Sequence, residues 1–149
     1  MAAVSNILFL CTGNSCRSQM AEGFAGAMLA DIVRAYSAGT HPQRLNPLAV
    51  RAMAEVGIDI SKHFSKSLAE VPTPEVIITV CDSAHESCPV VPGVRVLHVP
   101  FEDPPRLANG ARSDEDALPH YRRVRDEIAK FVAELRPRLL ELNLKEART

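Results

Sequence analysis

The chain has 149 residues, of which 46% are hydrophobic and 23% charged, the balance of an ordinary globular protein with enough apolar residues for one core. We therefore expect a single domain over residues 1–149. The net charge of −1 gives no electrostatic reason to bind nucleic acid or a membrane surface, and no apolar run approaches the roughly 20 residues of a membrane span.

The first half of the chain alternates between apolar runs and helical periodicity. A continuous apolar run at residues 7–10 predicts a buried strand. From Ser18 onward, apolar residues recur every three to four positions, which predicts a helix. A second strand is expected at residues 33–38. Asn46 then has the character of a helix cap and Pro47 that of a first helical residue.

The second half continues this alternation. Residues 76–80 are rich in β-branched side chains and predict a strand buried on both faces, and residues 94–99 predict a fourth strand. The last helix is expected from about Pro119, with Pro137 bending it or ending it early. The polar segment 106–118 is expected to be a mobile connection.

Strands that alternate with helices form parallel sheets, so we expect an α/β fold with a four-stranded parallel sheet and helices on both faces. Ligands of such sheets bind beyond the carboxyl ends of the strands. Cys11, Cys81 and Asp103 follow the first, third and fourth expected strands. Their side chains are therefore expected to meet at one edge of the sheet.

The cysteines indicate chemistry rather than cross-linking. The N-terminus has no basic start of a signal peptide, so a cytoplasmic location is expected. In that compartment, the four cysteines of the chain are expected to be catalytic or metal-binding rather than joined in structural disulfides.

In segment 11–18 a cysteine is separated by five residues from an arginine. Such a loop wraps its N–H groups around a tetrahedral anion, and the arginine holds the anion with a bidentate fork. The same N–H groups and the start of the following helix stabilise a cysteine anion. Cys11 is therefore the expected nucleophile. The expected oxyanion-binding residues are Thr12, Gly13, Asn14, Ser15, Cys16 and Arg17.

Three residues of this loop have additional expected roles. Ser18 is expected to donate a hydrogen bond to the sulfur of Cys11 and to take part in catalysis. Asn14 is expected to fix the loop through hydrogen bonds to backbone. Cys16 is expected to turn its side chain away and to act as a small packing residue.

A second cysteine pair, Cys81 and Cys88, has six residues between its members. This spacing is not usual for structural zinc, and a thiol–disulfide relay is the better interpretation. If residues 82–88 were helical, the two cysteines would lie roughly 10 Å apart along the axis, at 1.5 Å per residue. A disulfide needs Cα atoms within about 7 Å. We therefore expect residues 82–92 to rearrange on oxidation.

A carboxylate after the fourth strand is the candidate general acid. Asp103 holds this place, although an aspartate before proline is also common as the start of a turn. Glu102 is the alternative carboxylate. His63 and His85 are given no role.

Together these residues resemble the thioredoxin-coupled arsenate reductases of the low-molecular-weight protein tyrosine phosphatase family. The resemblance runs over almost the whole chain. Besides the Cys81/Cys88 pair, its motifs lie at residues 11–23, 36–39, 58–61, 103–104 and 122–128.

The resemblance implies two-electron reduction of arsenate to arsenite. Cys11 would attack arsenic, Cys81 would attack the sulfur of Cys11, and Cys88 would attack Cys81. Thioredoxin would then reduce the Cys81–Cys88 disulfide. Arsenate and thioredoxin are the expected partners of a monomer that needs no cofactor or metal and contacts neither nucleic acid nor membrane. Phosphate or sulfate is expected to fit the same site.

One position departs from the family pattern. Members that bind potassium use an Asn, a Glu, a Ser and an acidic residue. Asn14, Glu22 and Ser37 match the first three, whereas Lys66 stands at the fourth position. The ammonium of Lys66 is expected to pair with Glu22 in place of the ion.

Two alternatives remain open on sequence alone. A low-molecular-weight protein tyrosine phosphatase would use the same loop and Asp103, but its chemistry has no use for Cys81 and Cys88. Weak phosphatase activity is expected as a side reaction in any case. A non-enzymatic redox sensor or oxyanion-binding module would leave Arg17 and Asp103 without a role in turnover.

Overall fold

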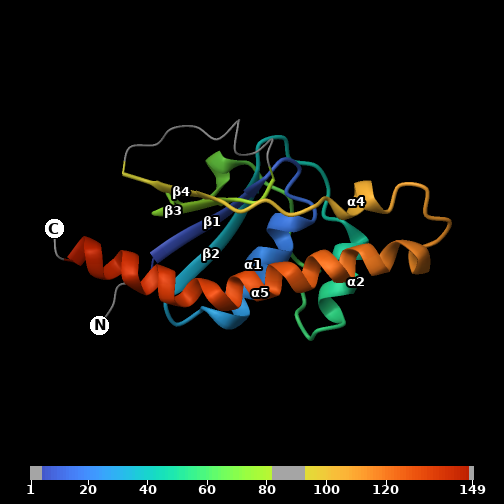
Figure 1. Cartoon of the computed structure of the whole chain (residues 1–149). Helices are drawn as coiled ribbons and strands as arrows, with labels where there is room; N and C mark the ends of the chain where they lie inside the picture. The colour runs from blue at the N-terminus through green and yellow to red at the C-terminus, as the bar shows by residue number, and fades with distance from the viewer. Residues whose placement is uncertain (1–4, 82–92, 148–149) are drawn as a thin grey trace.

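The computed structural model describes residues 5–81 and 93–147, with side chains as far as residue 141. Its parallel strands form one sheet in the order β2-β1-β3-β4 (Figure 1). The expected four-stranded parallel sheet is confirmed, and each strand lies within about two residues of its predicted bounds. The strands are β1 (Ser5–Cys11), β2 (Val33–Gly39), β3 (Val76–Thr79) and β4 (Arg95–His98).

Helices connect and cover these strands, and their labels are those of Figure 1. They are α1 (Arg17–Met28), α2 (Pro47–Ala54), the short 3-10 helix η1 (Leu68–Glu70), α4 (Pro104–Leu107) and α5 (Asp114–Ala147). The expected cap of α2 is confirmed, because Asn46 Oδ1 accepts hydrogen bonds from the N–H groups of Leu48 and Ala49 at 2.8 and 3.3 Å.

The polar connection expected at residues 106–118 is shorter in the structure, because helices occupy both of its ends. Helix α4 reaches Leu107, and α5 begins at Asp114 instead of Pro119. Ser113 sets this start, since its Oγ accepts a hydrogen bond from the N–H of Asp116 at 3.2 Å. The acidic residues of the first turn also complement the positive end of the helix dipole.

Pro137 does not end the last helix, although ending was one of the two outcomes expected for it. Helix α5 continues to Ala147. Leu135 and Leu139 flank the proline and are both buried. Burying each leucine is worth about 1.5–3 kcal/mol, which together matches or exceeds the ~3 kcal/mol cost of a proline inside a helix. Packing therefore outweighs the local penalty.

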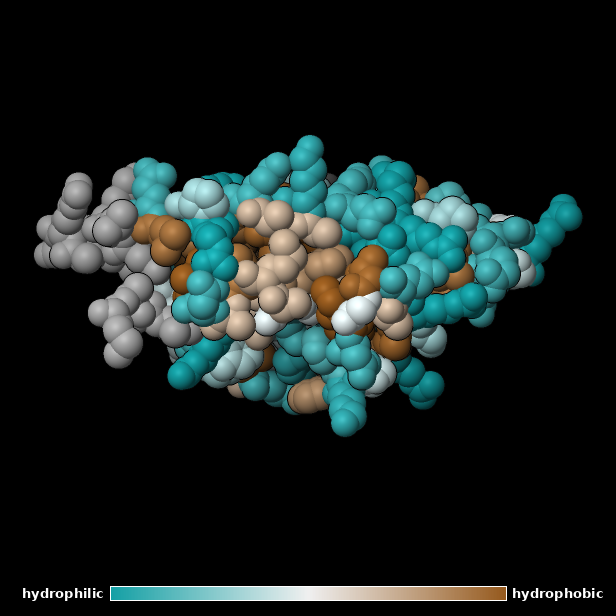
Figure 2. All heavy atoms as spheres, turned by 90° about the horizontal axis from the view of Figure 1, so that it is seen from below, coloured by the Kyte–Doolittle hydropathy of each residue, from teal (hydrophilic) through white to brown (hydrophobic). Residues whose placement is uncertain are grey.

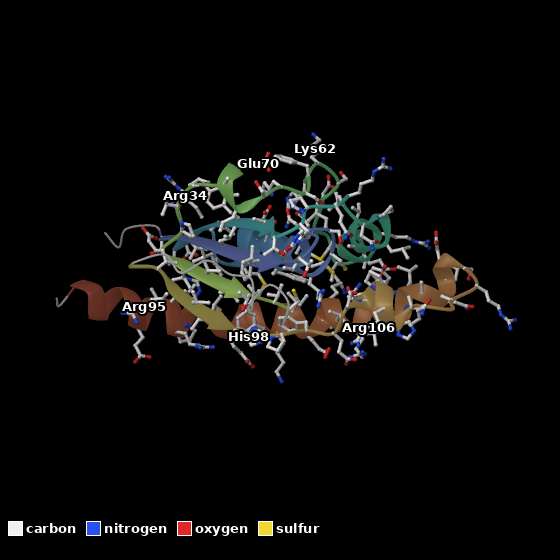
Figure 3. All side chains as sticks on the ribbon, turned by 90° about the horizontal axis from the view of Figure 1, so that it is seen from above. Arg34, Lys62, Glu70, Arg95, His98 and Arg106 are labelled. Carbon is white, nitrogen blue, oxygen red and sulfur yellow. The ribbon has the colours of Figure 1, made fainter. Side chains whose placement is uncertain are left out.

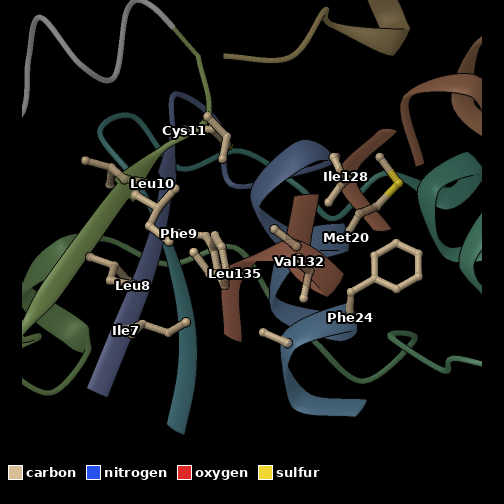
Figure 4. Close-up of a cluster of buried hydrophobic side chains, with 14 of the residues drawn as sticks. Ile7, Leu8, Phe9, Leu10, Cys11, Met20, Phe24, Ile128, Val132 and Leu135 are labelled. Atoms are coloured by element: carbon tan, nitrogen blue, oxygen red, sulfur yellow. The ribbon is translucent and has the colours of Figure 1, made fainter. Parts of the chain in front are cut away.

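The core lies between β1 and the pair of helices α1 and α5 (Figure 4). The side chains from Ile7 to Leu10 have no exposed surface. Met20 and Phe24 of α1 and Ile128 of α5 face the same region (Figure 4). Since β1 is buried on both faces, the residues at its carboxyl end start from a rigid position.

A buried arginine fastens α5 to α2. Arg125 is 8% exposed and donates to the carbonyl of Ala52 and to Glu55 Oε1, both at 2.9 Å. Arg122 donates to Glu55 Oε2 at 2.7 Å. The hydrogen bond from Arg122 has the largest effect on the pKa of Glu55. Together with the hydrogen bond from Arg125, it lowers this pKa to about 2. The motif at 122–128 thus holds α2, and with it the loop that precedes α2.

The outer surface is mostly polar. Seen from below, hydrophilic side chains border a band of less polar residues across the middle of the molecule (Figure 2). Within residues 5–81 and 93–147, no helix is both long and apolar enough to cross a membrane.

Candidate active site

The expected convergence at the carboxyl edge of the sheet is confirmed for three groups. Cys11 ends β1, Cys81 follows β3, and Asp103 follows β4. The hydroxyl of Thr12 lies 3.4 Å from Cys81 Sγ, and Arg17 Nη2 lies 3.5 Å from Asp103 Oδ1. One cavity of about 260 Å³ joins these segments. It is lined by Thr12, Arg17, Cys81, Pro100, Phe101, Asp103 and Arg106.

The place of this cavity follows from the strand order. β1 pairs with β2 on one side and with β3 on the other, in the order β2-β1-β3-β4. The chain therefore leaves β1 toward one side of the sheet and later returns to the other. Such a reversal opens a crevice beyond the carboxyl ends of the two central strands, where ligands of these sheets bind.

The sulfur of Cys11 is buried and contacted by two hydrogen-bonding groups. Ser18 Oγ lies 2.8 Å away, and the N–H of Asn14 donates to the sulfur at 3.2 Å. Ser18 Oγ also accepts from Asn14 Nδ2 at 2.8 Å, so its own hydrogen is available to Cys11. The expected hydrogen-bond contact between Ser18 and Cys11 is therefore present, and donation from Ser18 stays a prediction.

Asn14 fixes the loop as expected. It has a φ of 50°, in the left-handed region that asparagine tolerates better than most residues. Its side chain is fully buried, and Oδ1 accepts from the N–H of Lys66 at 3.0 Å and from Gln19 Nε2 at 3.1 Å. The loop is thereby tied to the segment that precedes η1.

Two carbonyl groups of the loop point toward the segment that precedes α2. Gly13 O and Ser15 O accept hydrogen bonds from Gln43 N and Asn46 N, in the loop before α2, both at 2.9 Å. In a trans peptide plane the N–H group points away from the carbonyl. The N–H groups that follow these carbonyls therefore face away from that segment, and that of Asn14 donates to Cys11 Sγ. Binding of an oxyanion by the loop N–H groups stays a prediction.

Cys16 is a packing residue in this structure. It is 3% exposed and precedes the first residue of α1. Burial raises the pKa of its thiol well above the usual range, and the charges of Asp103 and Cys11 add to the rise. A thiol held neutral in this way is a poor nucleophile, which agrees with the role expected for Cys16.

Arg17 connects the loop to the segment that follows β4. Its Nη1 donates to the carbonyl of Phe101 at 3.0 Å, while Nη2 makes the ion pair with Asp103. The Asp103 side chain is 36% exposed, so its carboxyl group has access to water. Arginine and carboxylate therefore border the same opening.

The expected pairing of Lys66 with Glu22 is confirmed. Lys66 Nζ lies 3.7 Å from Glu22 Oε1, which also accepts a hydrogen bond from Ser37 Oγ at 2.7 Å. The same ammonium donates to the carbonyl of Phe64 at 3.3 Å. His63 Nδ1 lies 3.2 Å from Glu22 Oε2. That Lys66 takes the place of a potassium ion stays a prediction.

Some expectations are untested, and some neighbours of the site were missed. Cys88 and the proposed rearrangement of residues 82–92 lie outside the described residues. Gln19 donates to Asn14 O and Phe64 O, both at 3.0 Å, and its contact with Phe64 has no signal in the sequence because that residue is 45 positions away. Arg106 lines the cavity but was assigned to a mobile connection.

Fold and loop together place the chain among the α/β proteins that hold a tetrahedral oxyanion above a cysteine. The model of one such family, described as low molecular weight phosphotyrosine protein phosphatase, matches residues 6–146. The chain belongs to this family.

Several curated relatives are arsenate reductases, and the solved structures of similar fold include arsenate reductases and a low molecular weight protein tyrosine phosphatase, with a TM-score of 0.72 at 26% identity for the latter. The arsenate reductase of Bacillus subtilis (strain 168) is 46% identical over 131 residues, which cover 86% of this chain and 92% of that protein. A solved structure described as an arsenate reductase in the phosphate binding state superposes with a TM-score of 0.71 at 31% identity, covering 91% of this chain and 99% of the other. The thioredoxin-dependent arsenate reductase of Corynebacterium glutamicum gives a TM-score of 0.67 at 25% identity, covering 93% of this chain and 63% of the other.

Proposed function

We propose that this protein reduces arsenate to arsenite with Cys11, Cys81 and Cys88 as a relay, and that thioredoxin restores the reduced enzyme. The observation that carries the proposal is the place of Cys81. Its sulfur lies 3.4 Å from the hydroxyl of Thr12, the first residue after the nucleophile. A phosphatase reaction would leave this second thiol at the cradle without a purpose.

In the first step, the thiolate of Cys11 attacks the arsenic of arsenate. A sulfur–arsenic bond forms and one arsenic–oxygen bond breaks, with no change in the oxidation state of arsenic. Asp103 supplies the proton that lets the oxygen leave as water or hydroxide. The loop N–H groups and Arg17 hold the remaining oxygens as charge builds on them.

In the second step, the thiolate of Cys81 attacks the sulfur of Cys11. The sulfur–arsenic bond breaks, and its electron pair stays with arsenic, which leaves as arsenite. Cys88 then attacks Cys81, and a Cys81–Cys88 disulfide replaces the Cys11–Cys81 bond. Two thiols are oxidised for each arsenic reduced by two electrons. A dithiol of thioredoxin reduces the final disulfide.

The deciding experiment measures NADPH consumption with arsenate, thioredoxin and thioredoxin reductase. The wild type should turn over many times and release one arsenite per NADPH. Cys88→Ser should stop after one turnover, because Cys81 then remains bound to Cys11. Mass spectrometry of the stalled variant should find that mixed disulfide.

A phosphatase is the competing function, since the family is named for this activity and the cradle suits phosphate equally well. Its signature is rapid aryl-phosphate hydrolysis without any arsenate-dependent NADPH consumption. That result in the wild type would exclude the proposed reductase. Slow hydrolysis beside brisk arsenate reduction agrees with it.

The proposal also covers the partners and setting of the reaction. We expect a monomer, since one chain carries all three cysteines, and a cytoplasmic location, where thioredoxin is kept reduced. A molecular mass near 16.3 kDa in light scattering is the expected result for the monomer.

A further inference from the structure

Two arginines line the cavity above the loop, and within residues 5–81 and 93–147 only the side chain of Arg17 is bonded to other protein groups. Arg17 donates to Phe101 O at 3.0 Å and pairs with Asp103 at 3.5 Å. The side chain of Arg106 is exposed, and no hydrogen bond or ion pair joins it to any residue in the described part of the chain. Its guanidinium is the cation at this cavity that is available to a ligand.

The position of Arg106 is fixed by a short element. Asp103 precedes α4 and Arg106 stands three residues further on, one turn along. The N–H groups of Ala108 and Asn109 both donate to backbone carbonyls of α4, at 2.9 and 3.1 Å. Figure 3 shows Arg106 beside the carboxyl end of the sheet, far from Arg34 at the opposite end.

We propose that Arg106 is a substrate-binding residue that captures the incoming oxyanion at the opening of the cavity. The inference rests on the proposed function only for the identity of the oxyanion. In the free enzyme the charge of Arg17 is partly neutralised by Asp103. An incoming dianion is therefore attracted to Arg106 before it reaches Arg17. A guanidinium offers the planar pair of donors that tetrahedral oxyanions accept.

The role differs from that of Arg17 in a measurable way. Arg17 stands at the end of the cradle loop, where its guanidinium would stabilise the negative charge that develops during the reaction. Arg106 is exposed, so its contribution is screened by salt and appears in binding rather than in the chemical step. Loss of Arg106 should therefore raise KM and leave kcat unchanged.

The test compares Arg106→Ala with wild type by calorimetric titration with inorganic phosphate, which needs no turnover. The dissociation constant should rise about three- to tenfold at low ionic strength, and the difference should shrink to under about twofold near 1 M salt. Arg106→Lys should keep most of the affinity. Arg34→Ala removes the same charge at the far end of the sheet and should bind phosphate as the wild type does.

Equal phosphate affinity of Arg106→Ala and wild type at low salt would overturn the proposal. So would an equal loss in Arg34→Ala, which would mean a general charge effect. If Arg106→Ala bound phosphate normally but raised the KM for thioredoxin, the residue would serve the reductant instead, and the proposal would be wrong. A wild type without arsenate turnover defeats the proposed function, while the phosphate titration still decides the role of Arg106.

Discussion

The loop after β1 and the segment after β4 border the same cavity but are built differently. In the loop, Asn14 and Ser18 are fully buried, and their side chains are bonded to neighbouring protein atoms. In the segment, Asp103 is about one third exposed and Arg106 is exposed. The proposed nucleophile and the proposed general acid thus have very different surroundings within one cavity.

This difference matches the two proposed tasks, which are charge stabilisation by the loop and proton donation by Asp103. A cradle for a developing negative charge works best when its donors are fixed before the reaction, because no reorganisation is then needed. A general acid must instead regain its proton from water after each turnover, which requires exposure. Hydrogen-bonded order is therefore concentrated around Cys11, and solvent access around Asp103.

The largest expected effect separates two cysteines of the same loop. Cys11→Ser should lower kcat by about 10⁶-fold or to the detection limit, as loss of a nucleophile does in other enzymes. Cys16→Ala should keep most of the activity, because burial holds its thiol neutral. Arsenate-dependent NADPH consumption measures both variants. An inactive Cys16→Ala that folds normally would contradict the assignment.

The next largest effect is expected for Asp103, in the exposed segment after β4. Asp103→Asn should slow formation of the arsenic adduct by about 10²- to 10⁴-fold, the usual contribution of a general acid. Glu102→Gln is the matched control, since Glu102 pairs with Arg123 at 3.2 Å on the surface. Values of kcat/KM for arsenate report the difference. The roles would be exchanged if Glu102→Gln were the slower variant.

A stability measurement contrasts the two regions directly. Asn14→Ala leaves the N–H of Lys66 without its acceptor and removes the donor to the buried Ser18 Oγ, so it should lower the free energy of unfolding by about 1–3 kcal/mol. Asn109→Ala, in the exposed segment after α4, should change it by less than about 0.5 kcal/mol. Urea unfolding followed by circular dichroism gives both values. Equal losses would remove the contrast between the regions.

The smallest expected effect is that of potassium on thermal stability, and it depends on the ion pair between Lys66 and Glu22. Because its ammonium already pairs with Glu22, replacing sodium by potassium at equal ionic strength should leave the thermal midpoint of the wild type unchanged. Lys66→Asp should introduce a stabilisation specific to potassium. A potassium-specific rise in the wild type would show that Lys66 does not take the place of the ion.

The sequence predicts the sheet and the catalytic loop well because both are encoded locally. The apolar run of β1 and the spacing of Cys11 and Arg17 need no information from elsewhere in the chain. Even the meeting of Cys81 with the loop follows from strand order, since parallel strands end at one edge. The contact between Thr12 and Cys81 agrees with that reasoning.

The start of α5 was predictable in part. Ser113 is followed by three acidic residues, a helix-start signal that competes with Pro119. Choosing between them requires the hydrogen bond from Asp116 N to Ser113 Oγ, which only the structure provides. The continuation past Pro137 depends on tertiary burial of Leu139, and no local pattern reports such packing.

Contacts between remote residues could not be predicted from one sequence. Gln19 reaches the carbonyl of Phe64, which is 45 positions away. Arg106 lies in a polar stretch where nothing distinguishes a cavity residue from a solvated one. Its availability becomes apparent only when Arg17 is seen to be engaged by Asp103.

The register of β1 and β3 has a kinetic consequence for the proposed relay. Leu10 lies opposite Thr79, so the cysteines that follow these strands start from adjacent, rigid positions. Attack of Cys81 on an adduct at Cys11 is then intramolecular, and well-oriented groups of this kind reach effective molarities of about 10⁵–10⁸ M. No free thiol in a cell approaches that value. Within the proposed relay, the pairing of β1 with β3 thereby favours Cys81 over any free thiol as the next sulfur to react.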